Sequence, residues 1–220
     1  METILTIQDI QQVTHDVRRI RLEKPKGYEF VPGQATEVSI HKEGWEKEKR
    51  PFTFTSLNSD PYLEFTIKCY TDHDGVTKQI GLLQPGDQLI IDDSWGAIAY
   101  SGEGYFIAGG AGITPFIAIL RQLQKDHSIG NNKLFFANKT SKDIIYREEL
   151  KSLLGDNAIF ILDTAEPGYP HGRIDQSFLE KQVEDFSRHF YICGPDPMIK
   201  SIEKIVEAKG AKPEAVVFEK

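Results

Sequence analysis

Hydrophobic and polar residues alternate along the first half of the chain. The runs repeat with a period of two, the side-chain period of a β-strand, and turn dipeptides such as Pro32-Gly33 and Pro85-Gly86 separate them. One short stretch, Thr77–Leu83, has a helical period instead. The pattern is typical of an antiparallel barrel or sandwich, and we expect a β-barrel. The strands predicted from it are 3–10, 17–23, 34–40, 52–57, 63–70 and 88–92.

The second half of the chain has solid apolar runs that alternate with amphipathic helical patterns. Helical faces are formed by Phe116, Ile119, Leu120 and Leu123 and, later, by Ile199, Ile202 and Val206. Such alternation predicts an α/β domain with a doubly wound, five-stranded parallel sheet that is covered on both faces. The predicted strands are 105–109, 133–138, 158–163, 189–194 and 215–219.

The change of pattern lies at the short polar segment Tyr100–Gly104. We therefore expect two domains, a barrel over residues 1–99 and an α/β domain over residues 104–220.

Composition narrows the class of protein. The 220 residues include 40% hydrophobic and 27% charged residues, which is ordinary for a globular chain, and the net charge of −7 argues against nucleic acid as a partner. The most apolar stretch, Tyr105–Leu120, is interrupted by glycines and a proline, so we expect no membrane span. The N-terminus has no signal-peptide core, and we expect a cytoplasmic protein.

Only two cysteines are present, Cys69 and Cys193. This number is too small for a disulfide framework, for a Cys-based zinc site or for an iron–sulfur cluster. We expect no metal site, and any iron–sulfur centre on another protein.

A glycine-rich segment, Gly109–Pro115, follows one predicted strand and opens a helix. Glycines at such a turn let a diphosphate approach the backbone, and the helix N-terminus offers unpaired N–H groups to it. Thr114 is suited to cap this helix and Pro115 to occupy its first turn. A tight strand–helix turn without a ligand is the simpler alternative.

A second segment, Arg50–Ser56, carries a charge, aromatic rings and hydroxyl groups on one strand. Arg50, Phe52 and Phe54 would share one face of it, with the threonines on the other. A functional role requires a phosphate for Arg50 and an aromatic ring system for its neighbours. An amphipathic strand with a solvated arginine explains the pattern equally well.

A third segment, Tyr191–Met198, is a strand that breaks sharply into a helix. Asp196 is a candidate N-cap, with Pro197 in the first turn. Cys193 would lie at the carboxyl edge of the parallel sheet, where ligands bind in such folds. No basic residue stands next to it in the sequence to activate the thiol, so we do not expect a nucleophile.

Taken in order, these motifs resemble the ferredoxin–NADP reductase superfamily of two-domain flavoproteins over nearly the whole chain. The flavin signature of that superfamily corresponds to Arg50, Phe52, Thr53 and Ser56, and its Gly-x-Thr signature to Gly75–Thr77. Asp93–Gly96 corresponds to the turn at the end of the barrel. Gly109–Pro115 and Cys193–Pro195 correspond to the nicotinamide-nucleotide motifs.

The resemblance implies a role for each matching residue. Arg50 would bind a flavin phosphate, Phe52 would lie against the isoalloxazine, and Thr53 would donate a hydrogen bond near flavin N5. Cys193 would lie beside the nicotinamide, so Thr53 and Cys193 are the candidate catalytic residues. One departure is that Phe52 replaces the usual tyrosine. The implied cofactor-binding residues are Arg50, Pro51, Phe52, Thr53, Ser56, Gly75, Val76 and Thr77 for the flavin and Gly110, Gly112, Thr114, Pro115, Cys193, Gly194 and Pro195 for the nucleotide.

The resemblance also implies the chemistry. A hydride would pass from NADH or NADPH to bound FAD, with FMN less favoured, at an approach of roughly 3–3.5 Å. Electrons would then leave singly to a carrier such as flavodoxin or ferredoxin. Asp163 and Glu166 favour NADH because they would repel a 2′-phosphate, whereas Lys139 and Lys142 could accept one.

An acidic carrier requires a locally basic docking surface. Candidate cations are Arg18, Arg19, Arg21, Lys24 and Lys26 in the first hairpin and Lys42, Lys47 and Lys49 before the flavin motif. A solvated strand face is the alternative for the first group. Phe218 is the terminal aromatic nearest the expected site, and we assign it no role.

Other functions remain open at this point. The same fold could release reduced free flavin as an NADH-dependent flavin reductase, act as a flavin-less regulatory or binding module, or serve as the electron-transfer subunit of a larger dehydrogenase.

Overall fold

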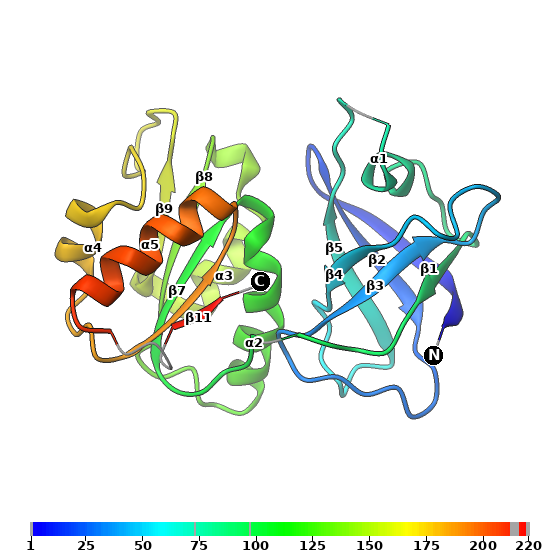
Figure 1. The fold of residues 1–220 in the computed structure, drawn as a ribbon, viewed down its shortest axis with the longest axis horizontal. Helices are drawn as coiled ribbons and strands as arrows, with labels where there is room; N and C mark the ends of the chain where they lie inside the picture. Colours follow the sequence, from blue (N-terminus) through cyan, green and yellow to red (C-terminus); the bar gives the residue numbers. More distant parts are fainter. Residues whose placement is uncertain (1, 73, 97, 212–215, 219–220) are drawn as a thin grey trace.

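The computed structural model describes residues 2–72, 74–96, 98–211 and 216–218, with side chains given up to residue 211. It confirms the predicted fold class: an antiparallel barrel precedes a parallel α/β sheet (Figure 1). Among the described residues, no helix has the length and apolar character needed to cross a membrane.

The barrel is built from β1 (Thr3–Thr14), β2 (Val17–Glu23), β3 (Ala35–Ile40), β4 (Arg50–Thr53), β5 (Tyr62–Lys68) and β6 (Gln88–Ile91), with one short helix, α1 (Val76–Ile80). Its strands follow the order β4-β3-β6-β1-β2-β5. A bridge between Phe54 and Phe65 joins the two end strands and closes the barrel. Phe54 is fully buried and stacks on Phe30 at 4.3 Å, so this aromatic belongs to the barrel core.

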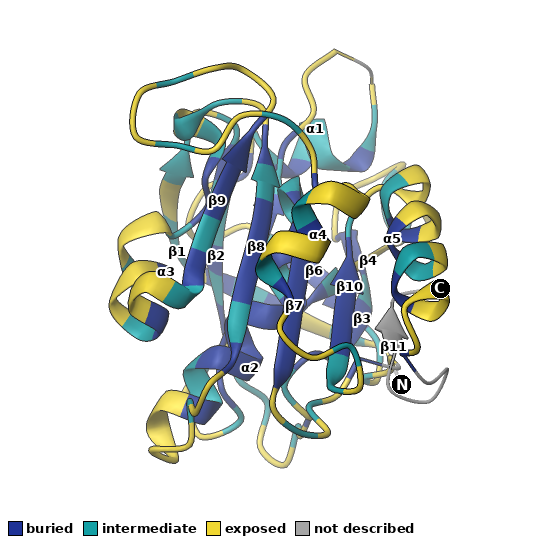
Figure 2. Ribbon diagram, turned by 90° about the vertical axis from the view of Figure 1, so that its left-hand side faces the viewer, coloured by how far each residue is buried: buried dark blue, intermediate teal, exposed yellow. Residues whose placement is uncertain are grey.

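The α/β part contains β7 (Gly104–Gly109), β8 (Lys133–Asn138), β9 (Ala158–Leu162), β10 (His189–Cys193) and β11 (Val216–Phe218). The five strands lie in the order β11-β10-β7-β8-β9, and all neighbouring pairs are parallel. Strands β8 and β9 lie on one side of β7, and the later strands β10 and β11 lie on its other side. Its central strands are buried on both faces (Figure 2), because α2 (Thr114–Lys125) and α3 (Arg147–Leu154) cover one face, and α4 (Gln176–Gln182) and α5 (Asp196–Ala208) cover the other.

Helix α2 lies between the parallel sheet and the barrel (Figure 1). Gly33 has a φ of +101°, and a Cβ there would stand 2.4 Å from the carbonyl oxygen of Ile98 and 3.2 Å from Ile119 of α2. Only glycine therefore allows the barrel to approach both the interdomain segment and α2. The predicted turn at Pro32-Gly33 thus also sets the spacing between the two parts of the chain.

The polar segment after the barrel is held by the α/β part. The hydroxyl of Tyr191 accepts hydrogen bonds from the backbone N–H groups of Ser101 and Gly102 at 2.9 and 3.1 Å, and it donates to the carbonyl of Gly102 at 2.7 Å. The ring of Tyr100 stacks on Phe106 and on Tyr191.

Local details differ from the sequence predictions at the helix termini. Ile113, not Thr114, is the N-cap of α2, and the Thr114 hydroxyl donates back to the carbonyl of Ala111 at 3.1 Å. Pro195, not Asp196, is the N-cap of α5. In both helices the proline stands in the first turn as predicted, because its missing N–H costs nothing there. The side chain of Phe218 lies outside the described residues.

Candidate functional site

Arg50 and the Gly75–Thr77 segment, which are far apart in the sequence, line one hollow of about 380 Å³ together with Tyr70 and Asp74. The Arg50 side chain is half exposed; its guanidinium donates to the carbonyl of Lys49 at 2.6 Å and lies 3.7 Å from Glu48. The N–H groups of Val76 and Thr77 open helix α1, ahead of its first intrahelical bonds. A cation and backbone donors beside an open hollow fit a phosphate group.

Tyr70 and Asp74 are members of this hollow that the sequence motifs did not single out. Asp74 would oppose an anion, but its carboxylate is paired with Lys78 at 2.8 Å, and that hydrogen bond lowers its pKa. No motif in the sequence pointed to either residue, because their link to Arg50 arises only when the chain folds.

The rest of the flavin motif lies next to the hollow or behind it. Pro51 is exposed, Phe52 is half-buried against the barrel core, and Thr53 is buried at the end of β4. Ser56 is also buried, and its hydroxyl accepts a hydrogen bond from the backbone N–H of Glu64 at 3.0 Å. In this structure Ser56 thus supports the β4–β5 junction and does not line the hollow.

The two nucleotide motifs meet at the carboxyl edge of the parallel sheet. A Cβ on Gly112 would lie 2.3 Å from the carbonyl oxygen of Cys193 and 2.6 Å from the N of Gly194, so these backbones are in direct contact. Gly110 has a φ of +52° and nothing within 4 Å of its Cβ position. The glycine turn is therefore packed on one side and open on the other, where a ligand could approach.

Pro195 is exposed next to this contact, Pro115 is buried in the first turn of α2, and Thr114 is half-buried. Cys193 is itself almost fully buried, with 3% of its surface exposed. The structure thus brings the predicted nucleotide-binding residues together in one place.

Acidic and basic candidates flank the ends of β8 and β9. The carboxylate of Glu166 accepts a hydrogen bond from the backbone N–H of Ser141 at 3.0 Å, and hydrogen bonding to the side chain and the backbone of Ser141 lowers the pKa of Glu166. Asp163 and Lys142, which stand close to Glu166 and Ser141 in the sequence, are exposed. At the end of β8, both amide atoms of Asn138 are buried and have no hydrogen-bond partner among the described residues. An orphaned buried amide at this edge fits a polar ligand or bound water.

The predicted docking cations are mostly engaged within the molecule. Arg18 donates to the carbonyl of Leu83, Arg19 pairs with Asp9 at 2.6 Å, and Arg21 pairs with Glu64 at 2.9 Å. Lys24 contacts Asn58, and Lys49 pairs with Glu2 and Asp92. The first hairpin is therefore not the free basic surface that its sequence suggests. The cations of the predicted group that remain exposed are Lys26, Lys42 and Lys47.

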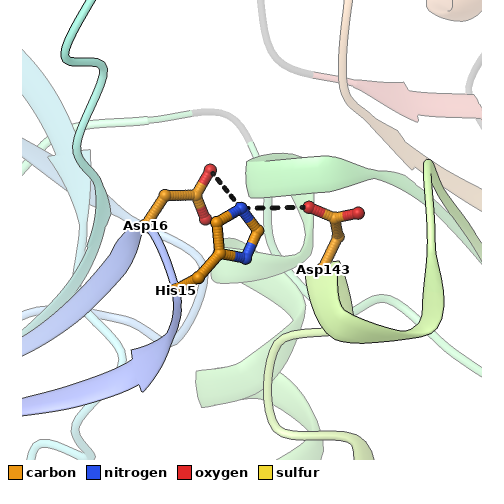
Figure 3. Close-up of side chains that lie close together, drawn as sticks. All are labelled: His15, Asp16 and Asp143. Carbon is orange, nitrogen blue, oxygen red and sulfur yellow. Dashed lines mark ion pairs between the residues drawn. The ribbon is translucent and has the colours of Figure 1, made fainter.

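One group of possible metal ligands occurs among the described residues, formed by His15, Asp16 and Asp143 (Figure 3). His15 Nε2 lies 3.6 Å from Asp16 and 3.7 Å from Asp143. Asp16 is already paired with Lys68 at 3.0 Å, and Asp143 accepts hydrogen bonds from the backbone and hydroxyl of Thr140. The group joins the β1–β2 hairpin to the α/β part, and both carboxylates also contact these other partners.

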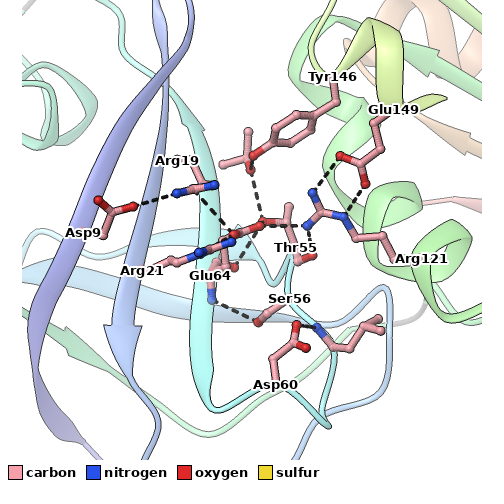
Figure 4. Close-up of polar contacts among 12 residues, drawn as sticks. Asp9, Arg19, Arg21, Thr55, Ser56, Asp60, Glu64, Arg121, Tyr146 and Glu149 are labelled. Atoms are coloured by element: carbon pink, nitrogen blue, oxygen red, sulfur yellow. Dashed lines mark hydrogen bonds and ion pairs between the residues drawn. The ribbon is translucent and has the colours of Figure 1, made fainter. Parts of the chain in front are cut away.

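The largest feature that sequence reasoning missed is a buried polar network between the two parts of the chain (Figure 4). Glu64 of β5 is 1% exposed and contacts Arg21 of the barrel and Arg121 of α2. In the sequence Glu64 stands between the apolar Leu63 and Phe65, the pattern of a strand with one polar side. Helix α2 packs against that side of β5 and buries it.

Comparisons with known proteins agree with this geometry. Residues 3–83 match an FAD-binding domain family, and residues 106–204 match the oxidoreductase NAD-binding domain family. The reductase component of propane 2-monooxygenase from Rhodococcus jostii is 28% identical over 234 residues, which is 96% of this chain and 61% of that protein. NADH-cytochrome b5 reductase 1 of Pyricularia oryzae is 28% identical over 91% of this chain and 72% of its own length.

A solved structure shares the fold. The crystal structure of a ferredoxin NADP⁺ reductase from Neisseria gonorrhoeae with bound FAD and NADP superposes with a TM-score of 0.85 at 19% identity, covering 99% of this chain and 98% of that one. One family match falls within the barrel and the other within the α/β part, and together they cover both the Arg50 hollow and the Gly112–Cys193 contact.

Proposed function

We propose, starting from the FAD-binding and oxidoreductase NAD-binding domains that this chain matches and from its resemblance to the ferredoxin–NADP reductase superfamily, that it takes a hydride from NADH and delivers electrons to a separate one-electron carrier. The observation that carries the proposal is the pairing of two sites in one chain. A hollow lined by Arg50 lies on the barrel, and an open glycine turn packed on Cys193 lies on the α/β sheet.

On the barrel, Arg50 would hold the flavin phosphate with the help of the N–H groups of Val76 and Thr77. Thr53, at the buried end of β4, would direct its hydroxyl toward the reacting edge of the flavin, and Phe52 would pack against its ring. When bound, FAD supplies the chemistry of accepting a hydride and passing on its electrons. The chain's residues bind, orient and shield it.

On the α/β sheet, Gly110 would let the nucleotide diphosphate reach the backbone, since its left-handed conformation leaves that side open. The contact between Gly112 and Cys193 would fix the loop that carries Cys193–Pro195 beside the nicotinamide. Buried Cys193 would act there as a packing surface.

The electron acceptor is proposed from chemistry and from relatives. The relatives named above are, by name, the reductase component of a propane monooxygenase and an NADH-cytochrome b5 reductase. We propose an acidic carrier such as a ferredoxin or a flavodoxin, which the exposed Lys26, Lys42 and Lys47 would meet.

The visible spectrum of the purified protein tests the function. We expect flavin absorption bands that bleach when NADH is added without oxygen, and electrons that then pass to ferredoxin or flavodoxin. The control is the same protein without a nucleotide. A colourless protein that cannot be reconstituted with FAD, or a bound flavin that neither nucleotide reduces, would contradict the proposal. Loss of the flavin from the protein on reduction would instead indicate a flavin reductase.

The choice between the two nucleotides gives a second expected result. We expect kcat/KM for NADH to exceed that for NADPH by about tenfold or more, because the ionised Glu166 and Asp163 would repel a 2′-phosphate. Glu166→Gln keeps an acceptor for the Ser141 N–H and removes the charge, so it should lower the ratio of kcat/KM for NADH to kcat/KM for NADPH. Glu184→Gln, which is paired with Lys133 at the opposite end of β8, is the control. An unchanged ratio in Glu166→Gln would exclude this residue from nucleotide selection.

A further inference from the structure

Arg121 is the central cation of the buried network between the barrel and the α/β part (Figure 4). Its Nε and Nη2 donate to the two carboxylate oxygens of Glu149 on α3 at 2.6 and 2.9 Å. Its Nη1 crosses to the barrel, where it donates to Glu64 at 2.8 Å and to the carbonyl oxygen of Thr55 at 2.6 Å. One guanidinium thus holds α3 on one side and the barrel on the other.

Glu64 anchors the barrel side of the network. Its carboxylate accepts hydrogen bonds from Arg121, from Arg21 at 2.9 Å and from the hydroxyl of Thr55 at 3.0 Å. Burial raises the pKa of Glu64, but Arg121 and these hydrogen bonds outweigh burial, and the net pKa lies below the ordinary value. The carboxylate therefore stays ionised at neutral pH and the bridge to Arg121 persists.

A second contact runs parallel to this bridge. The hydroxyl of Tyr146, just before α3, lies 3.1 Å from the hydroxyl of Thr66, which lies 3.1 Å from that of Thr55. Both crossings therefore end on the same two strands of the barrel, at Thr55 and on β5.

The network has a position that matters for the proposed reaction. Thr55 follows Thr53 of the flavin motif by two residues on the same backbone. Arg121 follows Thr114 by seven residues on α2, and a helix rises about 1.5 Å per residue, so roughly 10 Å of rigid helix separates it from the glycine turn. The network therefore links the segment that carries Thr53 to the helix that begins at the nucleotide motif.

Apolar contacts between the two parts hold them together without fixing a direction. Val17 of the barrel joins the apolar cluster under α2, and apolar contacts tolerate sliding because they are non-directional. Beside the network the interface is open, with a hollow of about 330 Å³ lined in part by Arg21, Tyr62 and Arg121. Charge-assisted hydrogen bonds with a bidentate geometry fix an orientation that apolar packing alone does not.

We propose that Arg121, Glu64 and Glu149 form an interdomain clamp that sets the orientation of the nucleotide-binding part over the flavin-binding part and so positions the two rings for hydride transfer. Arg121 and Glu64 are positioning residues in this proposal and touch neither ring. The proposal rests on the proposed function for its kinetic consequence. Its structural consequence, a fixed interdomain orientation, can be measured without any cofactor.

The test measures orientation and rate in the same variants. Spin labels at Lys47→Cys on the barrel and Lys181→Cys on α4, both at exposed positions, report the interdomain distance distribution by pulsed electron spin resonance. We expect a narrow distribution in the parent protein and a broad one in Arg121→Met. The limiting rate of flavin reduction at saturating NADH should fall by about 10- to 100-fold, because a misplacement of about 1 Å costs about that much, while the KM for NADH changes little.

Two further variants guard against a folding defect. Glu64→Gln/Arg121→Met removes both charges, so no unpaired charge is buried, and it should behave like Arg121→Met. Arg121→Lys keeps a charge for Glu64 but cannot hold Glu149 and Thr55 together, so it should be intermediate. The matched control is Lys133→Met, which breaks the pair with Glu184 within the α/β part and should change neither readout.

The clamp proposal is overturned if Arg121→Met keeps a narrow distance distribution, whatever its rate, or if the distribution broadens and the limiting rate stays at the parent value. A parent protein that NADH does not reduce, together with a distribution that broadens in Arg121→Met, overturns the proposed function and the kinetic role but retains the orientation clamp. The two failures are therefore distinguishable.

Discussion

Arg50→Ala should weaken FAD binding by about 10- to 100-fold and leave the fold intact. The reason is that a charge-assisted hydrogen bond to a phosphate contributes about 1.5–3 kcal/mol, and each 1.4 kcal/mol is a factor of ten. The guanidinium is free to make such bonds, since it holds only the carbonyl of Lys49 and a distant Glu48. The measurement is the flavin content after gel filtration, followed by titration of the apoprotein with FAD.

Two variants sharpen this result. Arg50→Lys keeps the charge but loses the planar fork, and it should fall between the parent and Arg50→Ala. Arg147→Ala is the matched control because the Arg147 side chain is also 50% exposed, as Arg50 is, but stands on α3 away from the hollow. Exposed substitutions of this kind change stability by only about 0.5 kcal/mol. Equal flavin retention in Arg50→Ala and Arg147→Ala would refute the phosphate role.

Gly112→Ala should abolish most of the NADH-dependent reduction, by about 100-fold or more, while FAD remains bound. A Cβ at this position would stand 2.3 Å from the carbonyl oxygen of Cys193 and 2.5 Å from its carbonyl carbon. Both neighbours are backbone atoms, so the glycine turn and the Cys193 loop must separate. Because hydride transfer depends on placement to within about 1 Å, we expect this separation to lower the rate of reduction by NADH far more than it lowers the stability of the fold.

The measurement for Gly112→Ala is rapid-mixing reduction by NADH compared with reduction by dithionite, which needs no nucleotide site. Gly155→Ala is the control, since nothing lies within 4 Å of the Cβ position of Gly155; unlike Gly112, it has a positive φ, +56°, so the control introduces backbone strain without a clash. The control should destabilise the fold by about 1–3 kcal/mol through backbone strain and leave the rate unchanged. A parent-like rate in Gly112→Ala would show that the contact with Cys193 does not position the nucleotide.

The order of elements could be predicted from the sequence because it depends on local spacing. A period of two defined strands such as Val17–Glu23, and apolar runs defined Lys133–Asn138, both with the observed bounds. Strand β4 was displaced from its predicted range because Phe54 turns into the barrel core. The helix caps were also assigned one residue late, since a side chain that can cap does not determine where the backbone becomes helical.

The motif residues were identified from local chemistry, but their grouping was decided by the tertiary structure. Arg50 meets Gly75–Thr77, and Gly112 meets Cys193, only when distant strands are placed side by side. The basic hairpin shows the opposite case, where Arg19 and Arg21 found acidic partners within the fold and ceased to be a free docking surface.

What the sequence by itself determined is the set of strands, helices and glycine turns, because these follow from residues within a few positions of one another. The tertiary structure alone decided which polar positions are buried. Glu64 has the alternation of a solvent-facing residue, yet it is 1% exposed because α2 covers that face of β5. A pairing such as Glu64 with Arg121 joins residues 57 positions apart, and no local periodicity records a contact at that separation.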